Sequence, residues 1–132
     1  MGFEEFPHTA DCALRVWAPD LASLFAEAAL GLNSVAGAEI GSGVRVTREI
    51  SLHESDAESL LVAFLTELVY SQEQEVLGFD RFRLCVSNRD LSGQMHGSRL
   101  VSVSKPIKAV TFHNLEIRES ARGQEAEIVF DV

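Results

Sequence analysis

The stretch that decides the fold runs from Ser55 to Val69 and reads SDAESLLVAFLTELV. Ser55 and Glu58 have the spacing of a capping box, in which two side chains satisfy backbone N–H groups at the start of a helix. Apolar residues then recur every three or four positions, which places them on one face of a helix. They are Leu61, Phe64, Leu65, Leu68 and Val69. The stretch therefore predicts an amphipathic helix with one buried face.

A second helix is predicted closer to the N-terminus. Ala18-Pro19-Asp20 supplies a turn and an acidic N-cap, and an apolar stripe at helical spacing follows it. The stripe consists of Leu21, Leu24, Phe25, Ala28 and Leu32. We expect this helix to end before Gly37.

In the rest of the chain apolar and polar residues alternate, as they do in half-buried strands. Strands are predicted over 3–6, 13–17, 44–52, 82–86, 101–103, 107–117 and 125–130, with turns at 41–43 and 91–93. Two helices packed on one face of a mixed, largely antiparallel sheet would bury these stripes. The sequence predicts an α/β fold, a two-layer sandwich, as a single domain over residues 1–132.

Composition restricts the class of protein. A chain of 132 residues suits one domain, and its apolar runs are shorter than the roughly 20 residues that a membrane-spanning helix needs. No secretion signal is recognisable at the N-terminus. Cys12 and Cys85 lack metal-ligand spacing and have apolar neighbours, which is typical of buried free thiols. These features predict a soluble cytoplasmic protein.

The charge balance argues against nucleic acid as a direct partner. Eleven basic residues stand against 20 acidic ones, which gives a net charge of -9. Proteins that bind RNA or DNA carry a basic footprint because they must neutralise phosphates. We therefore expect no direct nucleic-acid binding and no membrane binding, whereas a basic protein partner fits this charge.

The last two residues place two anionic groups side by side. Asp131 is followed only by Val132, whose terminal carboxylate lies next to the aspartate side chain. Like charges this close repel each other unless a cation joins them. If the fold brings Asp11 alongside, three oxygen donors converge, a set that suits a hard divalent cation. Alternatively, Asp11 caps a turn after Pro7 by accepting backbone N–H bonds.

Five segments in this order resemble the archease family. They are His8-Thr9-Ala10-Asp11, Leu24-Phe25 with Ala28 and Ala29, Leu60-Leu61-Val62, Lys108-Ala109-Val110-Thr111-Phe112-His113, and Phe130-Asp131-Val132. The resemblance runs essentially from end to end. Two positions depart from the family pattern, because Phe112 replaces a frequent tyrosine and Gln94 a frequent glutamate.

The resemblance implies an accessory protein rather than an enzyme. Archeases assist the GTP-dependent tRNA-splicing RNA ligase by promoting guanylylation of the ligase's active-site histidine and its repeated turnover. The family's metal ligands fall here on Asp11, Asp131 and Val132. Calcium is the expected ion, with magnesium and manganese as alternatives.

Three further side chains are candidates for supporting roles. His8 and His113 could orient the aspartates, although a lone histidine on a strand is more often structural. Lys108 could contact a phosphate of a partner or nucleotide, although a solvated lysine is the commoner case. We expect His53 and His96 to be surface residues.

Two other functions are compatible with the residues. In a small metal-dependent hydrolase or phosphoesterase, Asp11, Asp131, His8 and His113 would bind metal and activate water. The sequence contains no H-E-x-x-H, P-loop or G-x-S-x-G motif that would favour the hydrolase hypothesis. The other possibility is an interaction domain without a metal.

Overall fold

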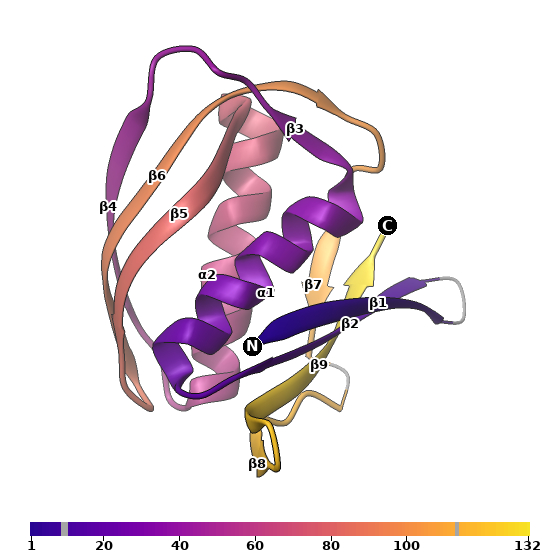
Figure 1. The fold of residues 1–132 in the computed structure, drawn as a ribbon, viewed down its shortest axis with the longest axis vertical. Coiled ribbons are helices and arrows are strands. Elements are labelled where there is room, and N and C mark those ends of the chain that lie inside the picture. Colours follow the sequence, from indigo (N-terminus) through magenta and orange to yellow (C-terminus); the bar gives the residue numbers. More distant parts are fainter. Residues whose placement is uncertain (9–10, 113) are drawn as a thin grey trace.

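The computed structural model describes residues 1–8, 11–112 and 114–132 of the chain. Two α-helices, a π-helical turn and nine strands occur in these ranges (Figure 1). The helices are α1 (Leu21–Ala36) and α2 (Ala57–Tyr70), and the π-helical turn η1 (Ser71–Glu75) follows α2. The strands are β1 (Gly2–His8), β2 (Asp11–Ala18), β3 (Ala38–Ile40), β4 (Val46–His53), β5 (Leu77–Val86), β6 (Asp90–Val103), β7 (Ala109–Thr111), β8 (Arg118–Ser120) and β9 (Gly123–Asp131).

The strands form two antiparallel sheets. The first sheet has the order β1-β2-β9-β7, and β8 pairs with another part of β9. In the second sheet β6 is central, with β4 on one side and β5 on the other, and β3 pairs with the far end of β6. Every strand pairing among the described residues is antiparallel.

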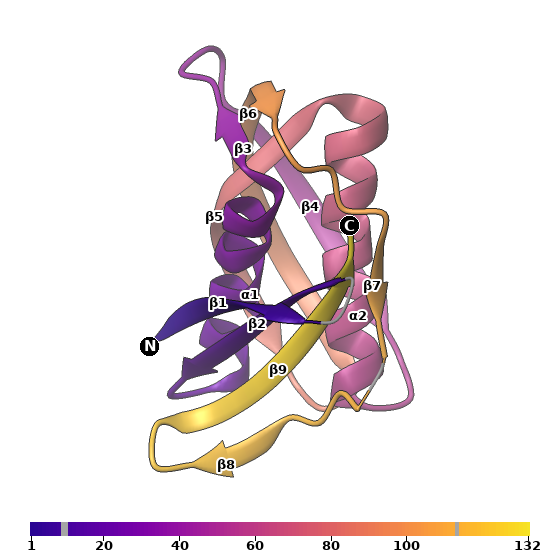
Figure 2. The ribbon, with the colours of Figure 1, turned by 90° about the vertical axis from the view of Figure 1, so that its right-hand side faces the viewer.

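Both helices lie between the two sheets (Figures 1 and 2). Helix α1 contacts β2 of the first sheet and β5 of the second, and α2 contacts β7 and β4. The phenyl rings of Phe25 and Phe64 join the helices with centroids 5.8 Å apart, and Phe82 of β5 lies 6.0 Å from Phe64. One hydrophobic cluster therefore includes residues of both helices and both sheets.

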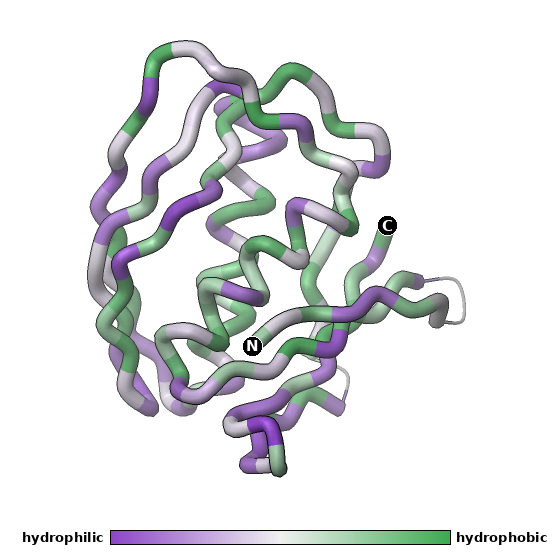
Figure 3. Tube along the Cα trace, viewed as in Figure 1, coloured by the Kyte–Doolittle hydropathy of each residue, from purple (hydrophilic) through white to green (hydrophobic). Residues whose placement is uncertain are grey.

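Hydropathy follows this arrangement. In Figure 3 the helices are largely hydrophobic, whereas hydrophilic residues recur along the strands of the second sheet. In β4 and β5 half-buried residues alternate with exposed ones, so each strand has one face toward the helices and one toward solvent. Within the described ranges, no helix is long and apolar enough to cross a membrane.

The predicted helix boundaries agree closely with the structure. Asp20 caps α1 by accepting a 2.8 Å hydrogen bond from the Ser23 N–H, and Gly37 ends the helix at a φ of 60°. Helix α2 differs from its prediction at one position, because the N-cap is Asp56 rather than Ser55. Its carboxylate accepts from the Ser59 N–H at 2.7 Å.

The α/β class, the two helices and the antiparallel strands are confirmed, but the strands belong to two sheets rather than one. Small residues on α1 explain the difference, since they allow a strand to approach the helix where no bulky side chain intervenes. A Cβ on Gly31 would lie only 2.9 Å from the Cδ1 atom of Leu14 in β2. Such a helix can be buried on two sides.

Three local predictions are wrong. Residues 91–93 lie inside β6 instead of forming a turn, and Gly93 is needed there because a Cβ would clash with the carbonyl oxygen of Arg83. The strand expected over 107–117 is limited to β7. Cys12 is buried as expected. Cys85 is exposed, because it lies on the same solvent-facing side of β5 as Arg81 and Arg83.

Candidate functional site

The register of β2 and β9 relates the two predicted aspartate ligands. These antiparallel strands pair Cys12 with Phe130, and Asp11 and Asp131 are the next residues on each strand. Continued by one residue, the same register sets Asp11 opposite Asp131. Residues directly opposite each other on neighbouring strands have Cβ atoms about 5 Å apart. The fold therefore relates two residues that are separated by nearly the whole sequence.

The two aspartates share the outer face of the first sheet. Cys12 and Phe130 belong to the buried core, so the side chains before and after them point the other way. Farther along this outer face, Arg15 and Glu127 form a part-exposed ion pair at 3.4 Å. Asp131 is exposed and Asp11 is half-buried. This end of the sheet therefore presents carboxylates beside solvent.

The chain end is held in place by packing and pairing. The side chain of Val132 is partly buried and packs against the hydrophobic core. On the other side of β9, Asp131 pairs with Ala109 of β7, and the Lys108 N–H donates a 2.7 Å hydrogen bond to the Asp131 carbonyl oxygen. Figure 2 shows this end of β9 beside β7. A paired strand thus holds the end of β9, with Asp131 and Val132, in a fixed position.

This donor set consists of oxygen atoms only. Carboxylate oxygens suit calcium, magnesium or manganese better than zinc, which is usually bound by nitrogen and sulfur. Across residues 1–8, 11–112 and 114–132, no group of three or more His, Cys, Asp or Glu side chains gathers as a metal site. The predicted set contains two such side chains, and its third donor is the terminal carboxylate.

The other predicted residues differ in what the structure says of them. His8 is the last residue of β1, and its backbone pairs with Asp11. His113 lies outside the described residues. Lys108 is exposed, while His53 is an exposed surface residue whose Nδ1 lies 2.7 Å from an Asp90 carboxylate oxygen. His96 is half-buried on β6 and lies 3.0 Å from the Thr47 hydroxyl.

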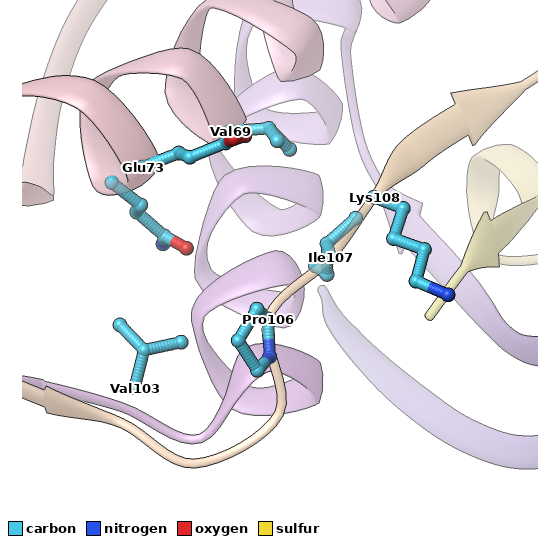
Figure 4. A pocket seen from close by; sticks show the side chains of 7 residues that line it. Val69, Glu73, Val103, Pro106, Ile107 and Lys108 are labelled. Atoms are coloured by element: carbon cyan, nitrogen blue, oxygen red, sulfur yellow. The ribbon is translucent and has the colours of Figure 1, made fainter.

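We call the end of the first sheet that carries Asp11, Asp131 and Val132 the carboxylate edge. A pocket of about 450 Å³ opens next to it (Figure 4). It is lined by Val69, Gln72, Glu73, Val103, Pro106, Ile107 and Lys108. Lys108 connects the pocket to the carboxylate edge. Its side chain lines the pocket, and its N–H donates a hydrogen bond to Asp131 at the end of β9. The pocket wall is largely apolar, with Glu73 and Lys108 as its charged groups.

A second charged region, which none of the sequence-based predictions includes, lies on the outer face of the second sheet. Arg45, Arg81, Phe82, Arg83, Gln94 and His96 line an open hollow of about 670 Å³. Arg45 forms two hydrogen bonds with Asp80, at 2.5 and 3.2 Å, and these lower the pKa of the Asp80 carboxyl. The sequence signal was the alternation Arg81-Phe82-Arg83-Leu84, which places both arginines on one face of a strand.

Comparison with known proteins decides the family. A family model described as the Archease protein family (MTH1598/TM1083) matches residues 3–132. This chain belongs to the archease family. A protein archease of Methanosarcina barkeri is 33% identical over 140 residues, which cover 98% of this chain and 95% of the relative. A protein archease of Pyrococcus furiosus is 30% identical and is matched over 98% of both chains.

Solved archease-like structures share the fold. The solution structure of protein 1598 from Methanobacterium thermoautotrophicum has a TM-score of 0.71 and 24% identity, over 99% of both chains. The crystal structure of an archease from Thermotoga maritima, described as a possible chaperone, also has a TM-score of 0.71, with 18% identity over 98% of this chain and 96% of that one. At these identities the likeness shows the fold alone.

Proposed function

We propose that this archease is a cytoplasmic accessory protein that activates a GTP-dependent tRNA-splicing RNA ligase. In this proposal it promotes guanylylation of the ligase's active-site histidine and repeated turnover of the ligase, and it performs no group transfer itself. Membership of the archease family supports this role. The net charge of -9 suits docking on a basic protein surface.

A divalent cation completes the proposed site. Asp11, Asp131 and the terminal carboxylate of Val132 hold the ion, and calcium is the preferred species. The observation that carries this proposal is the β2–β9 register, which when continued sets Asp11 opposite Asp131. Bound at this edge, the ion offsets the repulsion between neighbouring carboxylates and fixes the charge that the protein presents to its partner.

The residues around the ion have supporting roles in the proposal. His8 and His113 orient the aspartates, and Lys108 offers a cation to a phosphate of the ligase complex. The Lys108 N–H also fixes the end of β9 through its bond to Asp131. Positioned charges near a phosphoryl-transfer centre can stabilise the charge that develops during the reaction. The archease would thereby assist the ligase without a nucleophile of its own.

A turnover assay tests the function directly. Purified ligase is incubated with GTP, divalent ion and RNA ends, with and without substoichiometric archease, and both guanylylated ligase and joined RNA are measured. We expect faster guanylylation and more than one ligation per ligase molecule. An unchanged rate for both products would contradict the proposal.

A matched pair of variants separates the carboxylate edge from general acidity. Asp131→Asn should abolish most of the activation, because it removes a charged ion ligand. Asp90→Asn removes the same charge from an exposed position on the second sheet and should leave activation intact. Equal loss in both variants would show that overall charge, not this site, matters. Phosphate release by archease and metal alone would instead favour a phosphoesterase.

A further inference from the structure

The outer face of the second sheet gathers cationic side chains in an otherwise acidic protein. Arg81 and Arg83 lie on β5, opposite His96 and Gln94 of β6, and Arg45 precedes β4 on the far side of β6. Phe82 and Leu84 point inward and pack against the core, so the two arginines between and beside them point outward. Three of the 11 basic residues of the chain therefore line one hollow.

Two of these three guanidinium groups are less engaged than the third, although the charge of Arg81 also acts on the Asp80 carboxylate. Arg45 is occupied by Asp80 through two hydrogen bonds. In the described part of the chain, by contrast, Arg81 and Arg83 form no ion pair. Other carboxylates share this face: Glu49 lies across Gln94 from Arg83, and Asp90 lies farther along β6, where it pairs with His53. The hollow thus retains cationic character beside a paired Arg45.

The spacing of the two arginines favours a ligand with anionic groups in a row. Residues two apart on a strand are separated by about 6.6 Å and face the same side. Neighbouring phosphates along a nucleic-acid strand have a similar separation, whereas those of a nucleoside triphosphate lie much closer together. Guanidinium groups also match phosphate oxygens in geometry, because they can donate two parallel hydrogen bonds.

We infer that this arginine hollow binds the phosphate backbone of single-stranded RNA, with Arg81 and Arg83 each contacting one phosphate. Gln94 and the imidazole of His96 line the floor between the strands and add polar contacts. The site departs from the expectation based on net charge, because the net charge averages over two differently charged faces. Binding at the hollow does not depend on the proposed ligase or on the carboxylate edge.

Fluorescence anisotropy with a short labelled single-stranded RNA tests the inference on the complete chain alone. We expect weak, salt-sensitive binding. The double variant Arg81→Gln/Arg83→Gln should bind more weakly, and its plot of log affinity against log salt should be shallower by about 1.4, since each phosphate contact on a single strand contributes about 0.7.

A control variant keeps the same change in net charge. Arg89→Gln/Arg118→Gln removes two exposed arginines outside the hollow and should keep the wild-type salt slope. An equal loss in both double variants would overturn the inference, as would wild-type binding by the hollow variant. GTP serves as a second probe, and GTP binding that needs Arg81 and Arg83 while RNA binding does not would also overturn it. Circular dichroism confirms that each variant is folded.

Discussion

The two sheets of this archease are built in the same way but expose groups of opposite charge. Each buries one face against the helices and leaves the other face toward solvent. The first sheet ends in Asp11 and Asp131, whereas the second presents Arg81 and Arg83 around a hollow. A net charge of -9 therefore describes the whole chain but neither of these two surfaces. Strand pairing decides where the charges gather.

The inner faces of both sheets pack into one core, and Phe64 of α2 lies within it. It is fully buried and contacts Phe25 of α1 and Phe82 of β5. Phe64→Ala should lower the free energy of unfolding by about 3–5 kcal/mol, because the cavity it leaves cannot be filled. Urea unfolding followed by circular dichroism measures the loss. Phe112→Ala, at a residue 56% exposed, is the control, and equal effects would contradict the shared core.

The second sheet can be weakened separately at Gly97 of β6. A Cβ there would clash with the carbonyl oxygen of Gly78 on β5, so a backbone shift is unavoidable. We expect Gly97→Ala to cost about 1–3 kcal/mol of unfolding free energy. Gly43→Ala is the matched control, since a Cβ at Gly43 meets no atom within 4 Å. In Gly97→Ala, hydrogen exchange should accelerate more in β5 and β6 than in β2 and β9. A larger acceleration in β2 and β9 would contradict a defect confined to the second sheet.

The Arg45–Asp80 pair gives a smaller, pH-dependent contribution to the second sheet. Because Arg45 lowers the pKa of Asp80 below its ordinary value of 3.8, the pair stabilises the fold above that value and loses this contribution as the pH falls below it. Both side chains are substantially exposed and screened by solvent, so we expect only a small contribution.

Asp80→Asn should therefore destabilise the protein slightly at neutral pH and approach the wild type in acid. Thermal unfolding of both proteins at several pH values measures this difference. A stability gap that stays constant down to strongly acidic pH would contradict the role of Asp80 ionisation.

Local sequence patterns identified the helices well, because Asp20, Gly37 and the apolar stripes act within one segment. The division into two sheets was not predictable from alternation, which shows that a strand has a buried face but not which strand it pairs with. The same limit explains the missed arginine hollow, since Arg45 and Arg81 meet only through pairing with β6. Asp11 and Asp131 were proposed as partners from the chemistry of their carboxylates and from the family pattern, and the β2–β9 register, continued by one residue, sets them opposite each other.

The proposed cation site differs from one built of side chains alone, because it includes the Val132 carboxylate. Residues appended after Val132 convert its carboxylate into a neutral peptide carbonyl, whereas residues added before Met1 leave it unchanged. The most direct test is therefore calorimetric titration of calcium into the wild type, a chain extended after Val132 and a chain extended before Met1. We predict clearly weakened binding only in the chain extended after Val132. Equal calcium affinity in all three would contradict a cation held by Asp11, Asp131 and the end of the chain.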